Sequence, residues 1–192
     1  MDATLNITFA YRVTSLGLLM VAATKAGICF AGFGQDKRIL LEQLCREFPK
    51  ARLTPLGASS ETLQLDTWTS ALNAHLSGRQ PRPELPLDIR GTAFQKDVWE
   101  CLLNVREGET LSYSELALRV GRPAAVRAAA SACGRNRIAV LIPCHRVLRS
   151  DGSLGGYRWG LGRKQQLLER EASVSGQAYI SVPGCCTAAS VV

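Results

Sequence analysis

A thiol and an imidazole stand side by side at Cys144-His145, inside a run that reads Leu-Ile-Pro-Cys-His-Arg-Val. Pro143 has a restricted φ and no backbone N–H, so the apolar segment before it cannot continue as regular structure through the cysteine. The sequence therefore predicts a presented thiol, as a nucleophile requires. Three arginines near in sequence would favour the thiolate: Arg135, Arg146 and Arg149.

A buried structural cysteine is the competing interpretation of Cys144. Free cysteine is among the most buried residue types, and this chain of 192 residues contains 7 cysteines. Their spacing includes no C-x-x-C pair, which argues against a zinc module or a disulfide framework and favours reduced thiols in the cytoplasm. The rest of the chain has to decide between the two interpretations.

Composition indicates a globular protein with an uneven positive charge. Apolar residues make up 46% and charged residues 20%, and we expect neither a secretory signal nor a membrane span. The net charge is +7; residues 1–90 carry 10 Lys/Arg against 8 Asp/Glu, whereas residues 91–171 carry 13 against 8. A positive field around the candidate nucleophile is typical of a nucleic-acid partner, although a solvated basic face would have the same composition.

The first 85 residues predict a small α/β domain. Three β-prone segments separated by turns predict an antiparallel meander over residues 7–11, 18–23 and 28–33. Two helices are expected to follow, one capped by Asp36 and the other over residues 60–77. We interpret His75 on the second helix as a surface or capping histidine. The proline-rich run at residues 78–86 predicts a linker.

Residues 86–172 predict a helical domain that contains a helix-turn-helix. Capping-box spacing begins helices at Thr92 and Ser112, and Gly121 can end the second of them. Pro123 would then open a further helix that runs to about residue 133.

That further helix is almost entirely alanine, with Arg127 as its only long polar side chain. Direct readout of the major groove needs several such side chains, so the helix fits close contact with a shallow minor groove better. An alanine-rich helix packed in the core is the simpler alternative.

After the Cys-His pair, the sequence predicts a hairpin turn at residues 150–153, a glycine-rich loop at residues 155–160 and a last helix over residues 161–172. We expect residues 173–192 to form a flexible tail.

Motifs spread over residues 85–172 together resemble the O6-alkylguanine-DNA alkyltransferases, and most closely the alkyltransferase half of bacterial Ada proteins. They are Gly91-Thr92-Ala93-Phe94-Gln95, Ser112-Tyr113, Val126-Arg127-Ala128, Asn136, Ile142-Pro143-Cys144-His145-Arg146-Val147 and Gly156-Tyr157-Arg158-Trp159-Gly160. The resemblance implies an α+β fold of two domains, the first with an RNase H-like sheet. It favours the functional interpretation of both Cys144 and the alanine-rich helix.

The resemblance also implies a role for each matching residue. Cys144 would accept the alkyl group, with His145 drawing off its proton through a water, Glu171 orienting that histidine, Asn136 placing the thiol and Tyr113 assisting the leaving guanine. The DNA-binding residues would be Arg127, Ala125, Ala128, Ser112, Tyr113 and Arg135. The base pocket would be formed by Val147, Tyr157, Arg158, Trp159, Gly155 and Gly156.

The implied reaction is a single irreversible transfer. An alkyl group on O6 of guanine is out of reach inside a stacked duplex, so the nucleotide must first be flipped out. No residue is evident that would hydrolyse the resulting thioether, so each molecule, acting as a monomer on double-stranded DNA, would work once. Repair of O4-alkylthymine stays open.

Two departures from relatives give further expectations. Arg158 and the bulky Trp159 predict a tight pocket that prefers methyl to larger groups. Thr24 and Cys29 fall where some relatives have metal ligands, so we expect no zinc and no cofactor.

Two other classes of protein compete with this interpretation. One is a Cys-His hydrolase or redox sensor, although no oxyanion or resolving-cysteine motif is evident. The other is a DNA-binding transcriptional regulator like Ada, although the cysteine-rich metal module that precedes the alkyltransferase half there is not recognisable here.

Overall fold

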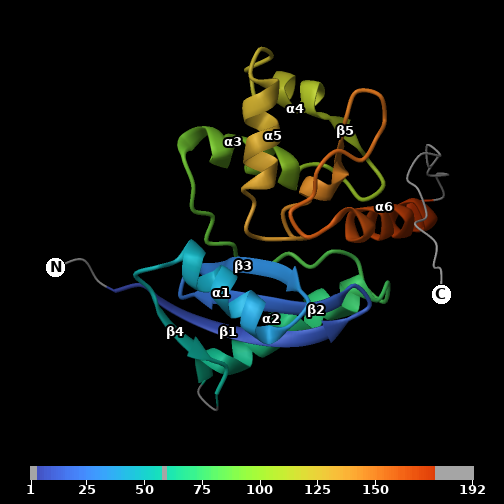
Figure 1. The fold of residues 1–192 in the computed structure, drawn as a ribbon. Coiled ribbons are helices and arrows are strands. Elements are labelled where there is room, and N and C mark those ends of the chain that lie inside the picture. The colour runs from blue at the N-terminus through green and yellow to red at the C-terminus, as the bar shows by residue number, and fades with distance from the viewer. Residues whose placement is uncertain (1–3, 58–59, 176–192) are drawn as a thin grey trace, which may run out of the picture.

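The computed structural model describes residues 4–57 and 60–175, which form a sheet half and a helical half (Figure 1). The sheet half contains β1 (Asn6–Thr14), β2 (Gly17–Thr24), β3 (Gly27–Gly34), α1 (Lys37–Glu47), β4 (Arg52–Pro55) and α2 (Ser60–Leu76). The helical half contains α3 (Ala93–Leu103), β5 (Leu111–Ser112), α4 (Tyr113–Arg119), α5 (Val126–Gly134), the 3₁₀ turn η1 (Cys144–Arg146), β6 (Val147–Leu148) and α6 (Leu161–Ser175). The α+β prediction is confirmed, and the domain boundary at residue 85 stays a prediction.

The predicted meander forms the main sheet, whose strand order is β3-β2-β1-β4. Alternate residues of β2 face opposite sides, as the two-residue period of a strand requires. Met20 and Ala22 pack with α1, whereas Leu19 and Val21 face α2 and the helical half. Strand β4 was not predicted. It lies parallel to β1 and is largely exposed, so its four residues carry little hydrophobic pattern.

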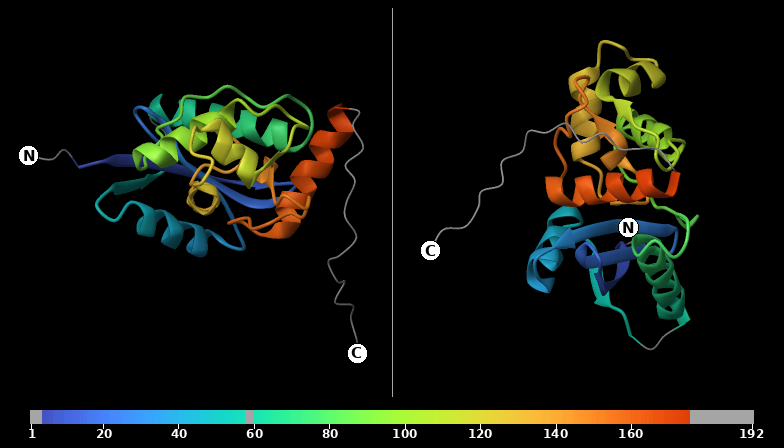
Figure 2. Two further views of the ribbon diagram at one scale, coloured as in Figure 1. Left: turned by 90° about the horizontal axis from the view of Figure 1, so that it is seen from above. Right: turned by 90° about the vertical axis from the view of Figure 1, so that its right-hand side faces the viewer.

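The free edge of β3 joins the two halves. Ile28 exchanges backbone hydrogen bonds with the end of the linker, through Pro86 O at 2.8 Å and Asp88 N at 2.9 Å. Further along the strand, Ala31 bonds Arg137 O at 2.9 Å and Ala139 N at 2.8 Å. The chain that leads to the Cys-His pair is therefore anchored to the sheet. Helix α6 runs between the sheet and the other helices (Figures 1 and 2).

Both predicted capping boxes are present, with Thr92 and Ser112 each bonding the backbone N–H three residues later. Gly121 ends the segment after α4 with a φ of 71°, a left-handed conformation that suits glycine. The prediction that Pro123 opens the next helix was wrong. Residues 122–125 form a separate turn, closed by Ala125 N and Arg122 O at 2.8 Å, and α5 begins only at Val126.

Two other expectations need correction. The turn at residues 150–153 forms, with Arg149 N bonding Ser153 O at 2.9 Å, but β6 pairs in parallel with β5 and has no antiparallel partner among the described residues. Helix α6 runs on to Ser175, beyond the predicted end at residue 172. The rest of the predicted tail, residues 176–192, lies outside the described residues.

His75 is also not at the surface as predicted. It is 3% exposed, because α6 and the linker cover the end of α2. Its Nδ1 lies 3.2 Å from Gln80 O, and its Nε2 lies 3.3 Å from the Arg170 guanidinium. Separately, no helix within the described residues is long and apolar enough to cross a bilayer.

Candidate active site

Cys144 is the first residue of η1, at the end of a buried segment that starts at Ile138. The chain turns sharply at Val140, whose φ of 70° is rare for a β-branched residue and is held by complete burial. Pro143 had suggested an exposed thiol, but Cys144 is only 4% exposed. It instead lines the wall of a cavity of about 400 Å³.

His145 and Arg146 share one buried carboxylate. His145 Nε2 lies 2.8 Å from Glu171 Oε1, and Arg146 donates to both oxygens at 2.8 and 2.9 Å. An ionised carboxylate only accepts, so Nε2 carries the ring proton and Nδ1 is left as the basic nitrogen. Nδ1 is buried and has no hydrogen-bond partner among the described residues. The contact between His145 and Glu171 is present, and it leaves Nδ1 free to accept a proton; their catalytic roles stay a prediction.

Hydrogen bonds and burial together set the protonation states of this group. Burial alone would raise the pKa of Glu171, but its bonds to His145 and Arg146 hold that pKa far below its ordinary value. Burial lowers the pKa of His145 and outweighs the opposing effect of Glu171. The carboxylate therefore stays ionised while the imidazole stays neutral.

Asn136 fixes the position of the thiol. Its side-chain amide donates to Ile142 O at 2.9 Å and to Cys144 Sγ at 3.2 Å, and its oxygen accepts from Ile138 N at 2.8 Å. The side chain is fully buried just after α5, so it ties the end of that helix to the nucleophile segment. These contacts are the ones that the predicted role of Asn136 in placing the thiol requires, and the role itself stays a prediction.

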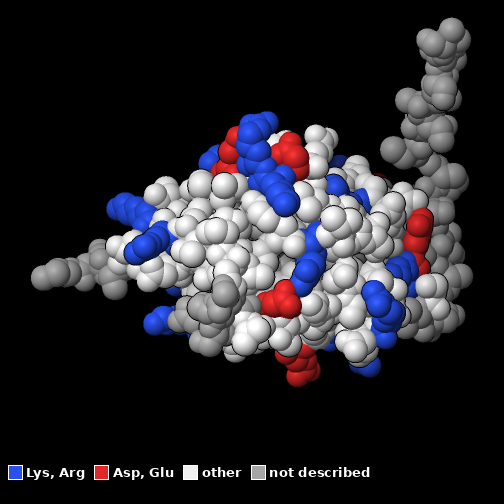
Figure 3. Space-filling view, turned by 90° about the horizontal axis from the view of Figure 1, so that it is seen from below, with Lys and Arg blue, Asp and Glu red and all other residues white. Residues whose placement is uncertain are grey.

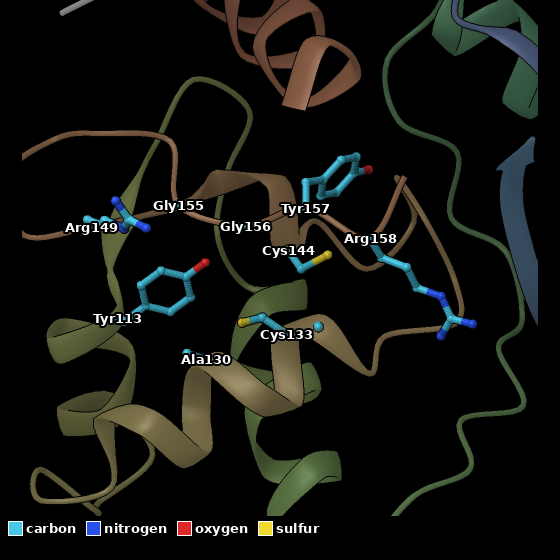
Figure 4. Close-up of a pocket in the computed structure, with 10 residues that line it drawn as sticks. Tyr113, Ala130, Cys133, Cys144, Arg149, Gly155, Gly156, Tyr157 and Arg158 are labelled. Carbon is cyan, nitrogen blue, oxygen red and sulfur yellow. The ribbon is translucent and has the colours of Figure 1, made fainter. Parts of the chain in front are cut away.

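Figure 4 shows the cavity between α5 and the glycine-rich loop. It is lined by Tyr113, Ala130, Cys133, Gly134, Cys144, Arg149, Gly155, Gly156, Tyr157 and Arg158. A Cβ at position 155 would lie 3.1 Å from the Tyr113 hydroxyl, and the φ of Gly155 is +63°. Glycine thus lets the loop pass directly over Tyr113. Burial raises the pKa of Tyr113 to about 12, which keeps its hydroxyl protonated.

Two of the six predicted base-pocket residues do not line the cavity. Val147 is fully buried in β6, where it pairs with Leu111. Trp159 is 4% exposed and packs beside Gly32 of the sheet, so its bulk cannot narrow the cavity as predicted. Arg158 does line the cavity, but its guanidinium points away from Cys144 (Figure 4).

Lys164 is a residue that the sequence analysis missed. It is fully buried in α6, and its ammonium group donates to Val147 O at 2.5 Å and also to Leu154 O. Burial lowers its pKa to about 8. Burial raises the pKa of Cys144, and the Asn136 hydrogen bond and the charge of Lys164 oppose that rise. Lys164 therefore supplies the positive charge that favours the Cys144 thiolate. The sequence had assigned this part to Arg146 among others, but Arg146 is paired with Glu171.

Lys164 gave little signal in the sequence, since one lysine in an amphipathic helix is usually a surface residue. Cys133 was also missed, although it lies in the cavity wall with its sulfur facing the same space (Figure 4). The helical period places Cys133 on the inner face of α5 together with the buried Ala129 and Ala132.

Of the six predicted DNA-binding residues, Arg127 and Ala128 lie in α5, Ala125 and Arg135 cap its two ends, and Ser112 and Tyr113 belong to β5 and α4. Arg127, Ala128 and Arg135 are exposed, whereas Ala125 and Ser112 are partly buried. The helix is thus neither wholly in the core nor wholly free. On the face seen from below the sheet, Lys and Arg are scattered among Asp and Glu over a mostly uncharged surface (Figure 3).

Comparisons with known proteins agree with this geometry. A family model described as the DNA-binding domain of 6-O-methylguanine DNA methyltransferase matches residues 93–173. The Escherichia coli bifunctional transcriptional activator/DNA repair enzyme Ada is 46% identical over 168 residues, which cover 88% of this chain and 46% of Ada. The inducible methylated-DNA–protein-cysteine methyltransferase of Bacillus subtilis is 35% identical over 159 residues, 82% of this chain and 86% of its own length.

A solved structure is similar over most of its length. Mycobacterium tuberculosis OGT in complex with DNA aligns with a TM-score of 0.73 and 32% identity, covering 86% of this chain and 93% of that one. The chain spans about half the length of the Ada proteins that it matches.

Proposed function

We propose, on the premise that this chain belongs to the family of methylated-DNA–protein-cysteine methyltransferases, that it repairs double-stranded DNA by taking the alkyl group from O6-alkylguanine onto its own Cys144. The observation that carries the proposal is the cavity itself. One wall of it holds a buried thiol next to an oriented His145, and the other holds the Tyr113 hydroxyl.

The reaction begins when the damaged nucleotide leaves the stack and enters the cavity, at a cost of a few kcal/mol. Arg127 on the exposed face of α5 would fill the gap left in the duplex, and the small alanines beside it allow close approach. A cavity of about 400 Å³ is in the usual range for a small bound group.

The thiol then reacts at the alkyl carbon. His145 Nδ1 takes the Cys144 proton through a water, the S–C bond forms, and the C–O6 bond breaks with its electron pair leaving on guanine. Because burial raises the pKa of Cys144, little thiolate would exist without this base. Tyr113, protonated at neutral pH, can donate to the leaving guanine.

The product is a thioether, and none of the described residues that line the cavity is placed to hydrolyse it. Each molecule would therefore act once, as a monomer. We place it in the cytoplasm because the 5 cysteines of the described residues are all free, in keeping with a reducing compartment.

The test is transfer of a labelled methyl group from O6-methylguanine DNA. We expect one label per chain, on Cys144, with none transferred to a Cys144→Ala variant and normal transfer to the control Cys101→Ala. Repeated turnover would favour a hydrolase, and label on the Cys144→Ala variant would contradict the proposal outright.

A further inference from the structure

Glu47, the last residue of α1, binds two arginines of the helical half. Its Oε1 accepts from Arg158 Nη2 at 2.5 Å, and its Oε2 accepts from Arg137 Nε at 2.5 Å. A carboxylate at a helix C-terminus is disfavoured by the helix dipole, so Glu47 is poorly placed for α1 itself. Burial would raise its pKa, but the two arginines hold the pKa below its ordinary value. Glu47 thus does not stabilise α1, and its hydrogen bonds instead tie α1 to two arginines of the helical half.

One of the two arginines lines the proposed alkyl-transfer cavity, and the other follows a residue that contacts the thiol. Arg137 directly follows Asn136, whose amide contacts the Cys144 thiol at 3.2 Å. Arg158 belongs to the loop that closes the cavity, and its side chain extends away from Cys144 (Figure 4). One carboxylate of the sheet half therefore holds both the segment behind the nucleophile and the loop over it.

This cluster is more enclosed than an ordinary surface ion pair. The side chains of Glu47 and Arg158 are 20% and 24% exposed, whereas those of Arg38 and Glu42 on the same helix are 74% and 51% exposed. Aromatic rings cover the guanidiniums: Arg137 lies 5.5 Å from the Phe48 ring centroid, and Arg158 lies 5.9 Å from that of Trp159. Such pairs are screened less by salt than exposed pairs.

We propose that Glu47 is a positioning residue that sets the size selectivity of the reaction, by anchoring Arg158 and with it the loop over residues 155–158. Because a methyl group adds one carbon to guanine and a benzyl group adds seven, the larger group requires more displacement of the loop, and this anchor resists that displacement. The sequence analysis had attributed a preference for methyl groups to the bulk of Arg158 and Trp159. Because Trp159 lies outside the cavity, we attribute this preference to the Glu47–Arg158 contact instead. The inference rests on the proposed function.

The experiment compares transfer rates from O6-methylguanine and O6-benzylguanine placed in the same duplex. In Glu47→Gln and in Arg158→Gln we expect the methyl-to-benzyl rate ratio to fall by about threefold or more, with no further fall in the double variant because one interaction is lost in all three. The matched control is Glu42→Gln, which removes the exposed pair of the same helix and should leave the ratio unchanged.

Equal slowing of both substrates in Glu47→Gln, or additive effects in the double variant, would overturn the inference. If circular dichroism shows that Glu47→Gln does not fold, Arg158→Gln decides alone, because Arg158 lies in a loop between β6 and α6 rather than in a helix or strand. An unsubstituted chain that transfers neither group would refute the proposed function and this inference together. A normal chain with unchanged ratios in the variants would refute this inference only.

Discussion

The proposed nucleophile, Cys144, is a buried thiol, and in the proposed reaction it depends on His145 as its base. Asn136 and Lys164 stabilise negative charge on Cys144, yet burial still raises its pKa. A thiol left neutral at rest is protected from oxidation and from metals, because both react with the thiolate. The Cys144 proton must then leave during the reaction. In the proposed mechanism His145 accepts it, and Glu171 orients His145 for that step.

The pH dependence of transfer tests this division of roles. Because its pKa is lowered, His145 becomes protonated only below the ordinary imidazole value of about pH 6.5. It therefore stops acting as a base only at more acid pH than an ordinary histidine would. At saturating DNA, we expect a single-turnover rate that is flat from about pH 6.5 to about pH 8.5 and falls only below this range.

The comparison variant is His145→Gln, whose rate should be much lower and should increase with pH as the thiol ionises unaided. A wild-type rate that climbs steadily through the same interval would mean that His145 is not the base.

At the scale of elements, α6 organises the site from behind. Glu171 bonds His145, and about two turns earlier the Lys164 ammonium joins β6 to the segment leading into the glycine-rich loop, through Val147 O and Leu154 O. One helix therefore orients the base and also fixes the distance between the nucleophile strand and the lid of the cavity.

Replacing Lys164 with methionine should uncouple those two segments. We expect the transfer rate to fall about 10- to 100-fold, since small displacements of reacting groups have effects of this size. Unsatisfied carbonyls should also lower the free energy of unfolding by about 1–3 kcal/mol, measured by urea titration. Gln165→Met, an exposed neighbour on α6, is the control. A Lys164→Met chain that reacts at the normal rate would show that the position of the glycine-rich loop does not depend on the hydrogen bonds of Lys164.

Elements with strong local signals could be predicted from the sequence, and contacts between distant elements could not. The capping boxes at Thr92 and Ser112 and the left-handed Gly121 depend on residues within one turn, and all three were predicted. The buried environments of His75 and Lys164 depend on which helix covers which, so their exposure was misjudged or missed. Within the candidate site, matching motifs supplied His145 and Glu171, but no local pattern could show that Trp159 packs against the sheet.

At the scale of the whole molecule, the sheet half acts as a platform for the helical half. One hydrophobic cluster continues from β2 and α2 into α3, α5 and the nucleophile segment, and the edge of β3 adds backbone hydrogen bonds. The cavity and α5 are thus held at a fixed distance and orientation. The proposed base-flipping reaction needs this, because α5 must contact the gap in the duplex while the flipped base occupies the cavity.

This fixed relation gives a prediction for Arg127, which is exposed on α5, whereas the proposed reaction takes place in the cavity lined by Cys144. If Arg127 fills the gap in the duplex, its removal should matter only where there is a gap to fill. For Arg127→Ala we expect transfer from duplex DNA to slow about 10- to 100-fold, because flipping costs a few kcal/mol, and transfer from the same strand without its complement to change little. The control Lys50→Ala, in the sheet half, should alter neither rate. Equal losses on both substrates would make Arg127 an ordinary phosphate contact, since backbone charge is present on single and double strands alike.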